Sequence, residues 1–222
     1  MSTDENHATN IPGIILFCFP IAAFKYYALL ILKELGESHN HEQIWEKTIE
    51  QQKRLALKRP RYSPGTNHLV RYMEWDYALY LALQEQGVAH FLIGEIIEKI
   101  NWAIFGPAIK AVSSLSHFRS KRLLTRIEWI VDLMFQFMFT APFQRHKHSR
   151  PNKVAFDVLV CPLAKYFNEQ NIPALTSSAA CSLDYHMADL WGVTLSRSQT
   201  IAQGYPHCDF CFHTNPVRIE SL

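Results

Sequence analysis

The apolar pattern of the chain changes after Pro142, and this change constrains the fold more than any other feature. Before it, apolar residues recur every three or four positions, as they do on one face of a helix. After it, residues 153–160 alternate, with Val154, Phe156 and Val158 on one face of an extended strand. Helices first and strands last is an α+β pattern. The sequence predicts a mainly helical N-terminal two-thirds and a C-terminal antiparallel β-sheet with two helices.

A single domain accounts for the length and composition of the chain. With 222 residues, of which 48% are apolar and 19% charged, the chain can bury a full core. We expect residues 1–10 to be a disordered tail and residues 11–222 to form one α+β domain. Within that domain, residues 11–142 are expected to be the helical part and residues 150–213 the strand-containing part.

Charge and hydropathy argue against nucleic-acid binding and against a membrane span. A formal net charge of +2 gives too weak a field to attract a polyanion. Residues 14–32 are apolar enough to resemble a span, but Pro20 and Lys25 interrupt them and no Lys or Arg precedes them. We expect a buried helix there, with a membrane anchor as the weaker alternative.

The five cysteines indicate a reducing compartment. An odd number cannot pair completely within one chain, and no secretory signal is recognisable. We therefore expect free thiols and a cytoplasmic location. The expected partner is a small-molecule substrate, and the sequence does not indicate an oligomeric state.

Capping residues and helix breakers divide the chain into elements. Asn40 suits the N-cap of one helix and Pro162 the first turn of another. A helix near the middle of the chain is expected to pack Trp129, Leu133 and Phe137 inward. Helices are expected over about 40–58, 68–86, 88–106, 120–140, 162–170 and 174–191, strands over 153–160, 193–201 and 208–213, and loops or turns at 60–67, 146–148 and 203–207.

Cys161 is the best candidate nucleophile on physical grounds. It ends a strand and precedes Pro162, so it lies at or beside a helix N-cap. Unpaired N–H groups and the helix dipole favour an anion there, and a thiol of pKa about 8.5 can become substantially thiolate at such a position. The alternative, equally weighted, is a small buried residue at a strand end.

Cys181 and Asp184 are three residues apart on an expected helix and share a face. Asp184 lies within about 60° of the centre of the apolar stripe of that helix, at roughly 100° per residue. A carboxylate so placed is costly unless it is paired or functional. It either forms a structural ion pair with Arg197 or binds a substrate amine or amidine and moves a proton.

Cys208 and Cys211 have a spacing that is common in metal and redox sites. On a strand, however, side chains three positions apart point to opposite faces, so the two thiols cannot form a simple chelate. Cys161 and Cys181 are too far apart in sequence to complete a zinc knuckle. Three thiolates that converge from separate elements are the weaker alternative.

The order of these residues resembles the L-2-amino-thiazoline-4-carboxylic acid hydrolase family. The resemblance covers about residues 150–213 and is fairly specific as a set, while the helical part offers no motif. Departures from the family pattern are His207, Cys211 and the Asn at position 171. The matching residues are Cys161-Pro162, Asn171-Ile172-Pro173, Cys181-x-x-Asp184, Arg197-x-x-Thr200, Gly204 and Cys208-Asp209-Phe210.

The resemblance implies ring-opening hydrolysis of a cyclic isothiourea or amidine that carries a carboxylate. In that interpretation Cys161 attacks the ring carbon or orients the attacking water, and Asp184 holds the amidinium and shuttles protons. Cys181 and Cys208 would line the same pocket. No cofactor is expected, although a thiolate-bound zinc or iron is an alternative.

Two residues would bind the substrate carboxylate, namely Arg197 with Thr200 nearby. On an ideal strand the two side chains face opposite sides, so both reach one pocket only if a bulge intervenes. Arg197 is alternatively the structural partner of Asp184. A second hypothesis of another class is a non-catalytic small-molecule- or metal-binding module with clustered cysteines.

Overall fold

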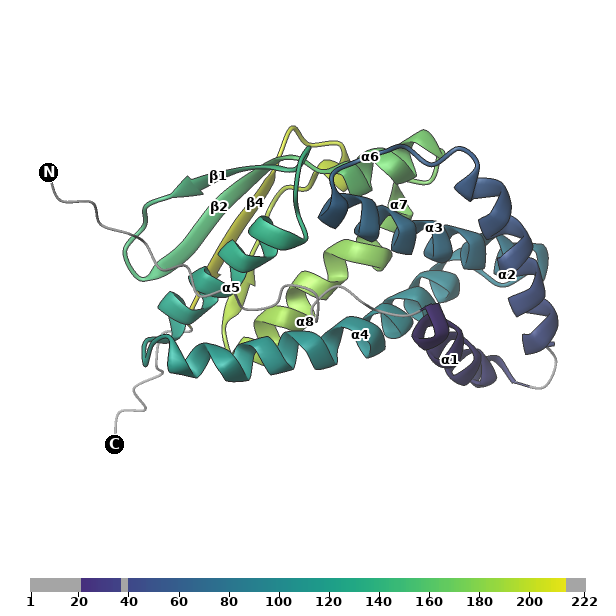
Figure 1. Ribbon diagram of the computed structural model, residues 1–222, viewed down its shortest axis with the longest axis horizontal. Coiled ribbons are helices and arrows are strands. Elements are labelled where there is room, and N and C mark those ends of the chain that lie inside the picture. Colours follow the sequence, from purple (N-terminus) through teal and green to yellow (C-terminus); the bar gives the residue numbers. More distant parts are fainter. Residues whose placement is uncertain (1–20, 37–39, 215–222) are drawn as a thin grey trace, which may run out of the picture.

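The computed structural model describes residues 21–36 and 40–214. The expected tail, residues 1–10, and the first part of the apolar segment, residues 14–20, lie outside the described residues. Helices gather at one end of the described chain and a helix-covered sheet forms the other (Figure 1). The predicted α+β class, mainly helical first and sheet-forming last, is confirmed.

Five helices form the helical part, and a side-chain cap starts the second of them. Asn40 caps its helix as predicted, since its Oδ1 accepts a hydrogen bond from the N–H of Gln43 at 3.1 Å. No helix in the described part of the chain is both long and apolar enough to cross a membrane. The helices are α1 (Ile21–Leu32), α2 (His41–Ala56), α3 (Pro64–Glu85), α4 (His90–Leu115) and α5 (Leu123–Phe137).

The predicted loop over residues 60–67 is wrong in its second half, because α3 begins at Pro64. Proline suits the first helical position, where its missing N–H has no partner to lose. Gly65 then lies directly under the end of α5, where a Cβ would come within 2.1 Å of the carbonyl oxygen of Phe137. The Pro-Gly pair therefore marks a close helix contact and not a turn.

The predicted end of a helix near residue 106 is also wrong, because α4 continues through Pro107 to Leu115. A proline removes one backbone hydrogen bond but does not exclude the helix when packing holds both sides. Ile104 and Phe105, just before Pro107, are buried in the core of the helical part. Tertiary packing thus outweighs the local breaker.

The inward face of α5 differs in part from the predicted one. Of the predicted residues Trp129, Leu133 and Phe137, Trp129 is partly buried against the core, but Phe137 is 38% exposed. Ile130 and Val131 lie instead in the core that α5 forms with the sheet, and Ile127 joins them. The helix is apolar on most sides, so its periodicity alone did not identify the buried face.

The sheet has four antiparallel strands in the order β1-β2-β4-β3. The predicted strand Lys153–Val160 has the same bounds in the structure, and so does the returning strand. One face packs on helices, while Leu159 on the other face is 46% exposed. The strands are β1 (Gln144–His148), β2 (Lys153–Val160), β3 (Thr194–Ser196) and β4 (Cys208–His213).

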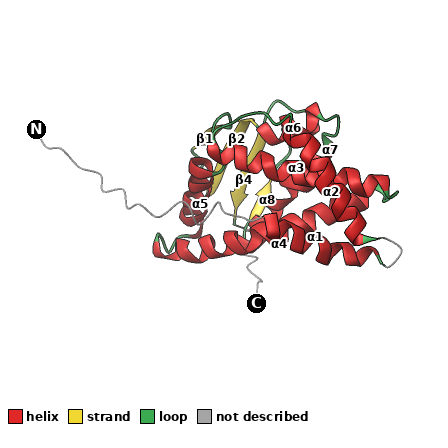
Figure 2. Cartoon of the chain, turned by 45° about the vertical axis from the view of Figure 1, so that its right-hand side comes forward, coloured by secondary structure: helices red, strands yellow, loops and turns green. Residues whose placement is uncertain are grey.

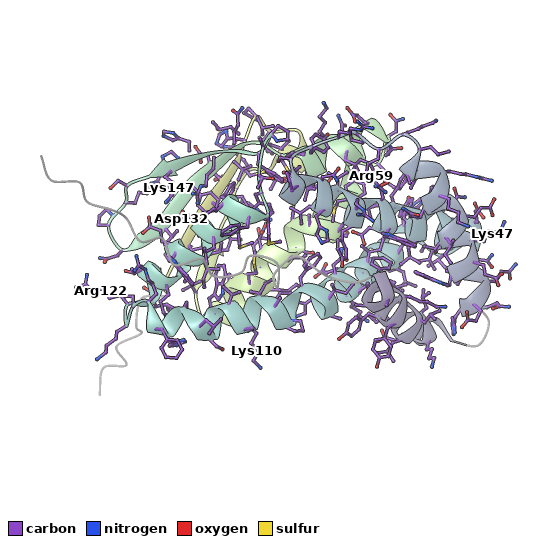
Figure 3. All side chains as sticks on the ribbon, viewed as in Figure 1. Lys47, Arg59, Lys110, Arg122, Asp132 and Lys147 are labelled. Atoms are coloured by element: carbon purple, nitrogen blue, oxygen red, sulfur yellow. The ribbon has the colours of Figure 1, made fainter. Side chains whose placement is uncertain are left out.

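Strand β1 replaces the surface loop expected at residues 146–148. Its sequence is polar throughout and gives no apolar alternation, because it lies at the sheet edge. Asp132 of α5 anchors it through Arg145 at 2.8 Å and Lys147 at 2.6 Å. Figure 3 shows Lys147 on this edge and Asp132 on the neighbouring helix.

The predicted strand over residues 193–201 is too long. β3 ends at Ser196, and a 3-10 turn (Ile201–Gln203) follows. Asp209 of β4 captures the intervening chain, because its carboxylate accepts hydrogen bonds from the N–H groups of Ser198 and Gln199 at 2.9 and 2.6 Å. These hydrogen bonds to the Asp209 side chain replace backbone pairing, so the β3–β4 pairing ends at Ser196.

The helix expected over residues 174–191 is interrupted by one π-helical stretch. Gly192 ends it in the left-handed conformation, with φ of 70°, as its position predicted. Nothing in the periodicity indicated the π-helical stretch. The elements are α6 (Pro162–Glu169), α7 (Ala174–Thr176), the π-helix Ser177–Cys181 (called the π-turn below) and α8 (Ser182–Trp191).

Two apolar cores stabilise the chain. The first joins α1–α4 with α6 and contains the stacked rings of Trp45 and Trp75, whose centroids are 5.5 Å apart. The second lies between α5, α8 and the sheet, where Trp191 meets Phe212 at 5.5 Å. Figure 2 shows the sheet at one end of the molecule and the α1–α3 bundle at the other.

Candidate functional site

A cavity of about 100 Å³ lies within the second core, between α5, α8 and the sheet. Apolar and aromatic side chains make up most of its wall. The polar groups on that wall come from six residues in distant parts of the sequence: Cys161, Thr176, Cys181, Asp184, Arg197 and Cys208. Five of these six were candidate site residues on sequence grounds, and the structure brings all five together.

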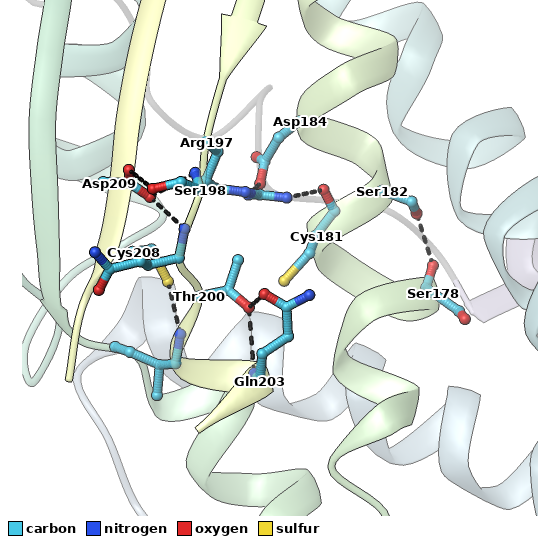
Figure 4. Close-up of polar contacts among 12 residues, drawn as sticks. Ser178, Cys181, Ser182, Asp184, Arg197, Ser198, Thr200, Gln203, Cys208 and Asp209 are labelled. Carbon is cyan, nitrogen blue, oxygen red and sulfur yellow. Dashed lines mark hydrogen bonds and ion pairs between the residues drawn. The ribbon is translucent and has the colours of Figure 1, made fainter. Parts of the chain in front are cut away.

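Arg197 and Asp184 form a buried ion pair beside the cavity (Figure 4). Nη1 of Arg197 donates to Oδ2 of Asp184 at 2.5 Å, and Nη2 donates to the carbonyl oxygen of Cys181 at 3.0 Å. The guanidinium lies 5.0 Å from the ring centroids of both Tyr185 and Phe210. The structural pairing that sequence reasoning gave as an alternative is therefore present.

Asp184 is poised to exchange a proton near neutral pH. Burial raises the pKa of its carboxyl to about 6, although the Arg197 guanidinium opposes that rise. A group with such a pKa is populated in both protonation states at neutral pH. This property is typical of a general acid or base.

Cys161 lies at the N-cap of α6 as predicted, and its Sγ accepts a hydrogen bond from the N–H of Ala164 at 3.5 Å. Of the two predicted alternatives, thiolate and small buried residue, the surroundings favour the second. Burial raises the pKa of the thiol to about 12, and the nearby Cys208 and Asp184 raise it further. Desolvation therefore outweighs the helix terminus.

The other two cavity thiols are also neutral. Burial raises the pKa of Cys181 and of Cys208, and Sγ of Cys208 accepts a hydrogen bond from the N–H of Ile201 at 3.2 Å. Cys211 does not line the cavity, which agrees with its predicted place on the opposite face of β4. It faces Ser196 and Ala155 in the ladder.

Thr200 does not line the cavity. Its Oγ1 accepts a hydrogen bond from the N–H of Gln203 at 3.2 Å and donates to Oε1 of the same residue at 3.0 Å. Because β3 ends before it, the bulge that would bring Thr200 and Arg197 to one side is not needed. Thr200 caps the 3-10 turn that carries the N–H bonded to Cys208.

Sequence reasoning missed the aromatic wall and one hydroxyl. Phe135 and Phe139 are four residues apart, a spacing that put them on one side of a helix, but nothing pointed to a cavity beneath them. Phe143 completes this wall after the end of α5. Thr176, 1% exposed, lines the cavity and had no signal in the sequence.

The cysteines do not assemble a recognisable metal site. Among residues 21–36 and 40–214, no group of three or more His, Cys, Asp or Glu side chains is arranged to hold a metal ion. The carboxylate of Asp184, beside the Arg197 guanidinium, is the group of this wall best placed to transfer a proton.

Comparisons with known proteins give a family and a distant structural likeness. An Fe(II) unliganded H-NOX protein from K. algicida is 12% identical, with a TM-score of 0.49 over 90% of this chain and 98% of that chain. An H-NOX protein from S. oneidensis in the Fe(II)NO ligation state is 10% identical, with a TM-score of 0.42 over 87% and 99%. Both scores lie below 0.5, so the likeness is distant.

No curated protein sequence matches the chain. The family match is extensive, because residues 74–212 fit L-2-amino-thiazoline-4-carboxylic acid hydrolase, and this range includes every polar residue of the cavity wall. It also reaches into α3 and α4, where the sequence offered no motif. The chain belongs to the L-2-amino-thiazoline-4-carboxylic acid hydrolase family.

Proposed function

We propose that this protein is a hydrolase that opens the ring of a cyclic isothiourea or related amidine bearing a carboxylate. The observation that carries the proposal is Asp184, a carboxylate with a pKa of about 6 and a side chain only 19% exposed, on the wall of a mostly apolar cavity. Family membership supports the reaction class. An apolar wall with a few convergent polar groups is typical of small-molecule sites, and this cavity has that composition.

Ring opening of such a substrate needs three things. A nucleophile must attack the carbon between the sulfur and the nitrogens, a proton must reach the departing ring atom, and the charges of the substrate must be compensated. Asp184 can supply the second by cycling between its two protonation states. It can also compensate a positively charged amidinium, because its Oδ1 is not the atom bonded to Arg197.

In the first route a water molecule is the nucleophile. With the substrate as an amidinium, Asp184 takes a proton from this water while the oxygen bonds to the ring carbon, and the C=N electron pair moves to nitrogen, which becomes a neutral amine. Asp184 then returns the proton to the departing sulfur or nitrogen as its bond to carbon breaks. The hydroxyl oxygen forms the C=O double bond and releases its proton to solvent. Cys161 orients the water in this route and stays protonated, as its pKa of about 12 favours.

In the second route Cys161 attacks the ring carbon itself. Its thiol proton passes to Asp184 as the sulfur–carbon bond forms, and Asp184 delivers that proton to the departing ring atom. Water then hydrolyses the covalent intermediate and the thiol is restored. This route has to overcome the raised pKa of Cys161, so we favour the first.

The main role of Arg197 in this proposal is to bind Asp184. Its two Nη atoms bind Asp184 and the backbone of Cys181, so a substrate carboxylate could reach them only by exchange. Its Nε is buried and has no hydrogen-bond partner among the described residues. That N–H is the donor of Arg197 left for a substrate.

The proposal needs no cofactor and places the protein in the cytoplasm. Cys161, Cys181, Cys208 and Cys211, the cysteines in the described part of the chain, are free thiols, which supports a reducing compartment. The partner is a small molecule. We assign Thr200 a supporting role, through the 3-10 turn, in place of the direct substrate contact expected from its position in the motif.

The test is ring opening of 2-amino-thiazoline-4-carboxylate by purified protein, followed by NMR. We expect Asp184→Asn, which removes the titrating group and keeps its size, to slow turnover at least about 100-fold. Cys211→Ser is the matched control, since it alters a thiol of β4 outside the cavity, and should turn over normally. A fully active Asp184→Asn protein would overturn the proposal.

Cys161 variants separate the two routes in the same assay. Under the water route Cys161→Ser keeps a group that can orient water and retains measurable turnover, while Cys161→Ala loses more. Under the nucleophile route both variants lose turnover alike, and a covalent adduct on wild-type Cys161 is detected by mass spectrometry.

A non-catalytic binding module is the second candidate. The observation that favours it is that burial keeps all three cavity thiols neutral, so the resting cavity holds no strong nucleophile. Under that function the wild-type protein binds the thiazoline, seen by titration calorimetry, and returns it unchanged. Turnover by wild-type protein excludes this candidate.

A further inference from the structure

The π-turn lies directly beside the cavity and carries Cys181 at its end. A π-helical turn holds more residues than an α-helical turn, so it rotates everything that follows around the helix axis. Asp184 follows Cys181 by three residues and lies in the first turn of α8. The direction in which both side chains face the cavity therefore depends on the π-turn.

A side chain from α4 holds the π-turn by its backbone. Asn101 is fully buried, and its Nδ2 donates one hydrogen bond to the carbonyl oxygen of Ala179 at 2.9 Å and another to Oδ2 of Asp76 at 3.0 Å. Both amide hydrogens are thus used. Asn101 links α3, α4 and the π-turn through one neutral group.

Asp76 accepts the hydrogen bond at the α3 end of this link. It is fully buried on α3, and burial raises the pKa of its carboxyl well above the ordinary value of 3.8. Burial therefore favours its protonated, neutral form. A neutral carboxyl can accept the Asn101 hydrogen bond without the cost of a buried charge.

Two further contacts fix the same turn. Gly94 of α4 lies so close that a Cβ there would be 2.7 Å from Oγ of Ser178. On the cavity side, Nη2 of Arg197 donates to the carbonyl oxygen of Cys181 at 3.0 Å. The π-turn is held from α4 on one side and from the ion pair on the other.

We propose that Asp76 and Asn101 are positioning residues that hold the π-turn and thereby aim Cys181 and Asp184 at the cavity. The inference rests on the proposed function for its effect on turnover, but the geometry it predicts can be measured without turnover. Neither residue touches the cavity, so both act through the backbone they hold.

The first test replaces Asn101 by Leu, which has a similar size and no hydrogen-bonding group. We expect the rate at which iodoacetamide labels Cys181 in the folded protein, followed by peptide mass spectrometry, to rise at least about tenfold. Asp76→Asn keeps the acceptor and neutral charge and should label within about twofold of the wild type. Unchanged labelling in Asn101→Leu would contradict the proposal.

A control separates positioning from general loss of stability. Thr48→Val removes a buried hydrogen bond of 2.8 Å to the carbonyl oxygen of Ile44, within α2 and remote from the cavity. It should lower stability and leave Cys181 labelling unchanged. If Thr48→Val raises the labelling as much as Asn101→Leu does, the role of Asn101 is structural only.

A second perturbation covers the case in which Asn101→Leu does not fold. Gly94→Ala is favourable for a helix interior but must push Ser178 aside. We expect it to change Cys181 labelling, and the double variant Gly94→Ala with Ser178→Ala to restore the wild-type rate. Wild-type labelling in the single variant, or no restoration in the double variant, would overturn the proposal.

Turnover supplies the last readout and separates the two proposals. If the wild type opens the ring, the acid limb of its pH profile, expected near pH 6, should shift in Asn101→Leu and not in Thr48→Val. If the wild type does not open the ring, the proposed function fails. The labelling results then still decide whether Asp76 and Asn101 position the turn.

Discussion

Two buried aspartates, one in each core, have different surroundings and therefore different chemistry. Asp76 in the helical part meets a neutral amide, Asn101, and burial drives its pKa well above the ordinary range. Asp184 beside the cavity meets the guanidinium of Arg197, and its pKa rises only to about 6. A cation within hydrogen-bond reach keeps a buried carboxylate titratable. The first aspartate can hold structure, while the second can also move protons.

Removing the Arg197 guanidinium should have the largest effect on the difference between Asp184 and Asp76. Arg197→Met should make Asp184 resemble Asp76, with a pKa well above 6. We expect the free energy of unfolding to fall by about 3–5 kcal/mol, because one partner of a buried pair is lost. We also expect the acid limb of the pH–activity profile to move upward. Denaturant unfolding and initial rates measure the two effects.

A surface pair provides the matched control for that variant. Arg54, 66% exposed, pairs with Glu50 at 2.6 Å on α2. Arg54→Met should change stability by at most about 1 kcal/mol, as exposed pairs do. If Arg197→Met costs no more than Arg54→Met, the ion pair does not have the energetic weight assigned to it.

The pH dependence of stability sharpens the comparison. Asp184 titrates at about 6 in the folded state against an ordinary 3.8, so the folded protein holds a proton between these values that the unfolded chain has released. Rising pH therefore favours unfolding in that window, by about 3 kcal/mol in total for a shift of about two units. The variant Asp184→Asn should lack this loss.

The variant Asp76→Asn is compared with Asp184→Asn in the same measurement of stability against pH. The stability gained by Asp184→Asn over the wild type should level off above pH 6, where Asp184 has finished titrating. The gain of Asp76→Asn should also grow with rising pH, because burial raises the pKa of Asp76 too, but over a different pH range, since its hydrogen-bond partner is a neutral amide and not a cation. Identical curves for the two variants would show that the surroundings do not distinguish them.

The sequence predicted those features that depend on local pattern. Alternation fixed the bounds of β2, and the positions of Asn40, Pro162 and Gly192 gave helix ends that the structure confirms. The order of polar motif residues also identified five of the six polar groups on the cavity wall. The last residue, Thr176, belongs to no motif.

Features that depend on tertiary contacts were missed. Pro107 does not end α4, because packing on both sides of it outweighs one lost hydrogen bond. The edge strand β1 shows no alternation, since all of its residues are polar. The capture of the backbone at Ser198 by Asp209 shortens β3, and a partner so distant in sequence leaves no local signal.

Cys161 combines a feature set by local sequence with one set by tertiary contacts. Its N-cap position follows from sequence, but the desolvation that decides its pKa comes from side chains distant in the chain. The cation of the cavity lies against Asp184 and leaves Cys161 without similar compensation. Within one cavity, burial thus leaves the carboxylate titratable near neutrality and the thiol protonated.

Labelling rates test this last difference. At pH 8 we expect iodoacetamide to modify Cys161 at least about tenfold more slowly than Cys211, which lies outside the cavity, because only the thiolate reacts. The rate at Cys161 should continue to rise up to pH 10 without a plateau, as a pKa of about 12 requires. Fast labelling with a plateau below pH 8 would instead indicate a thiolate stabilised by the helix N-terminus, and the nucleophile route would become the stronger of the two.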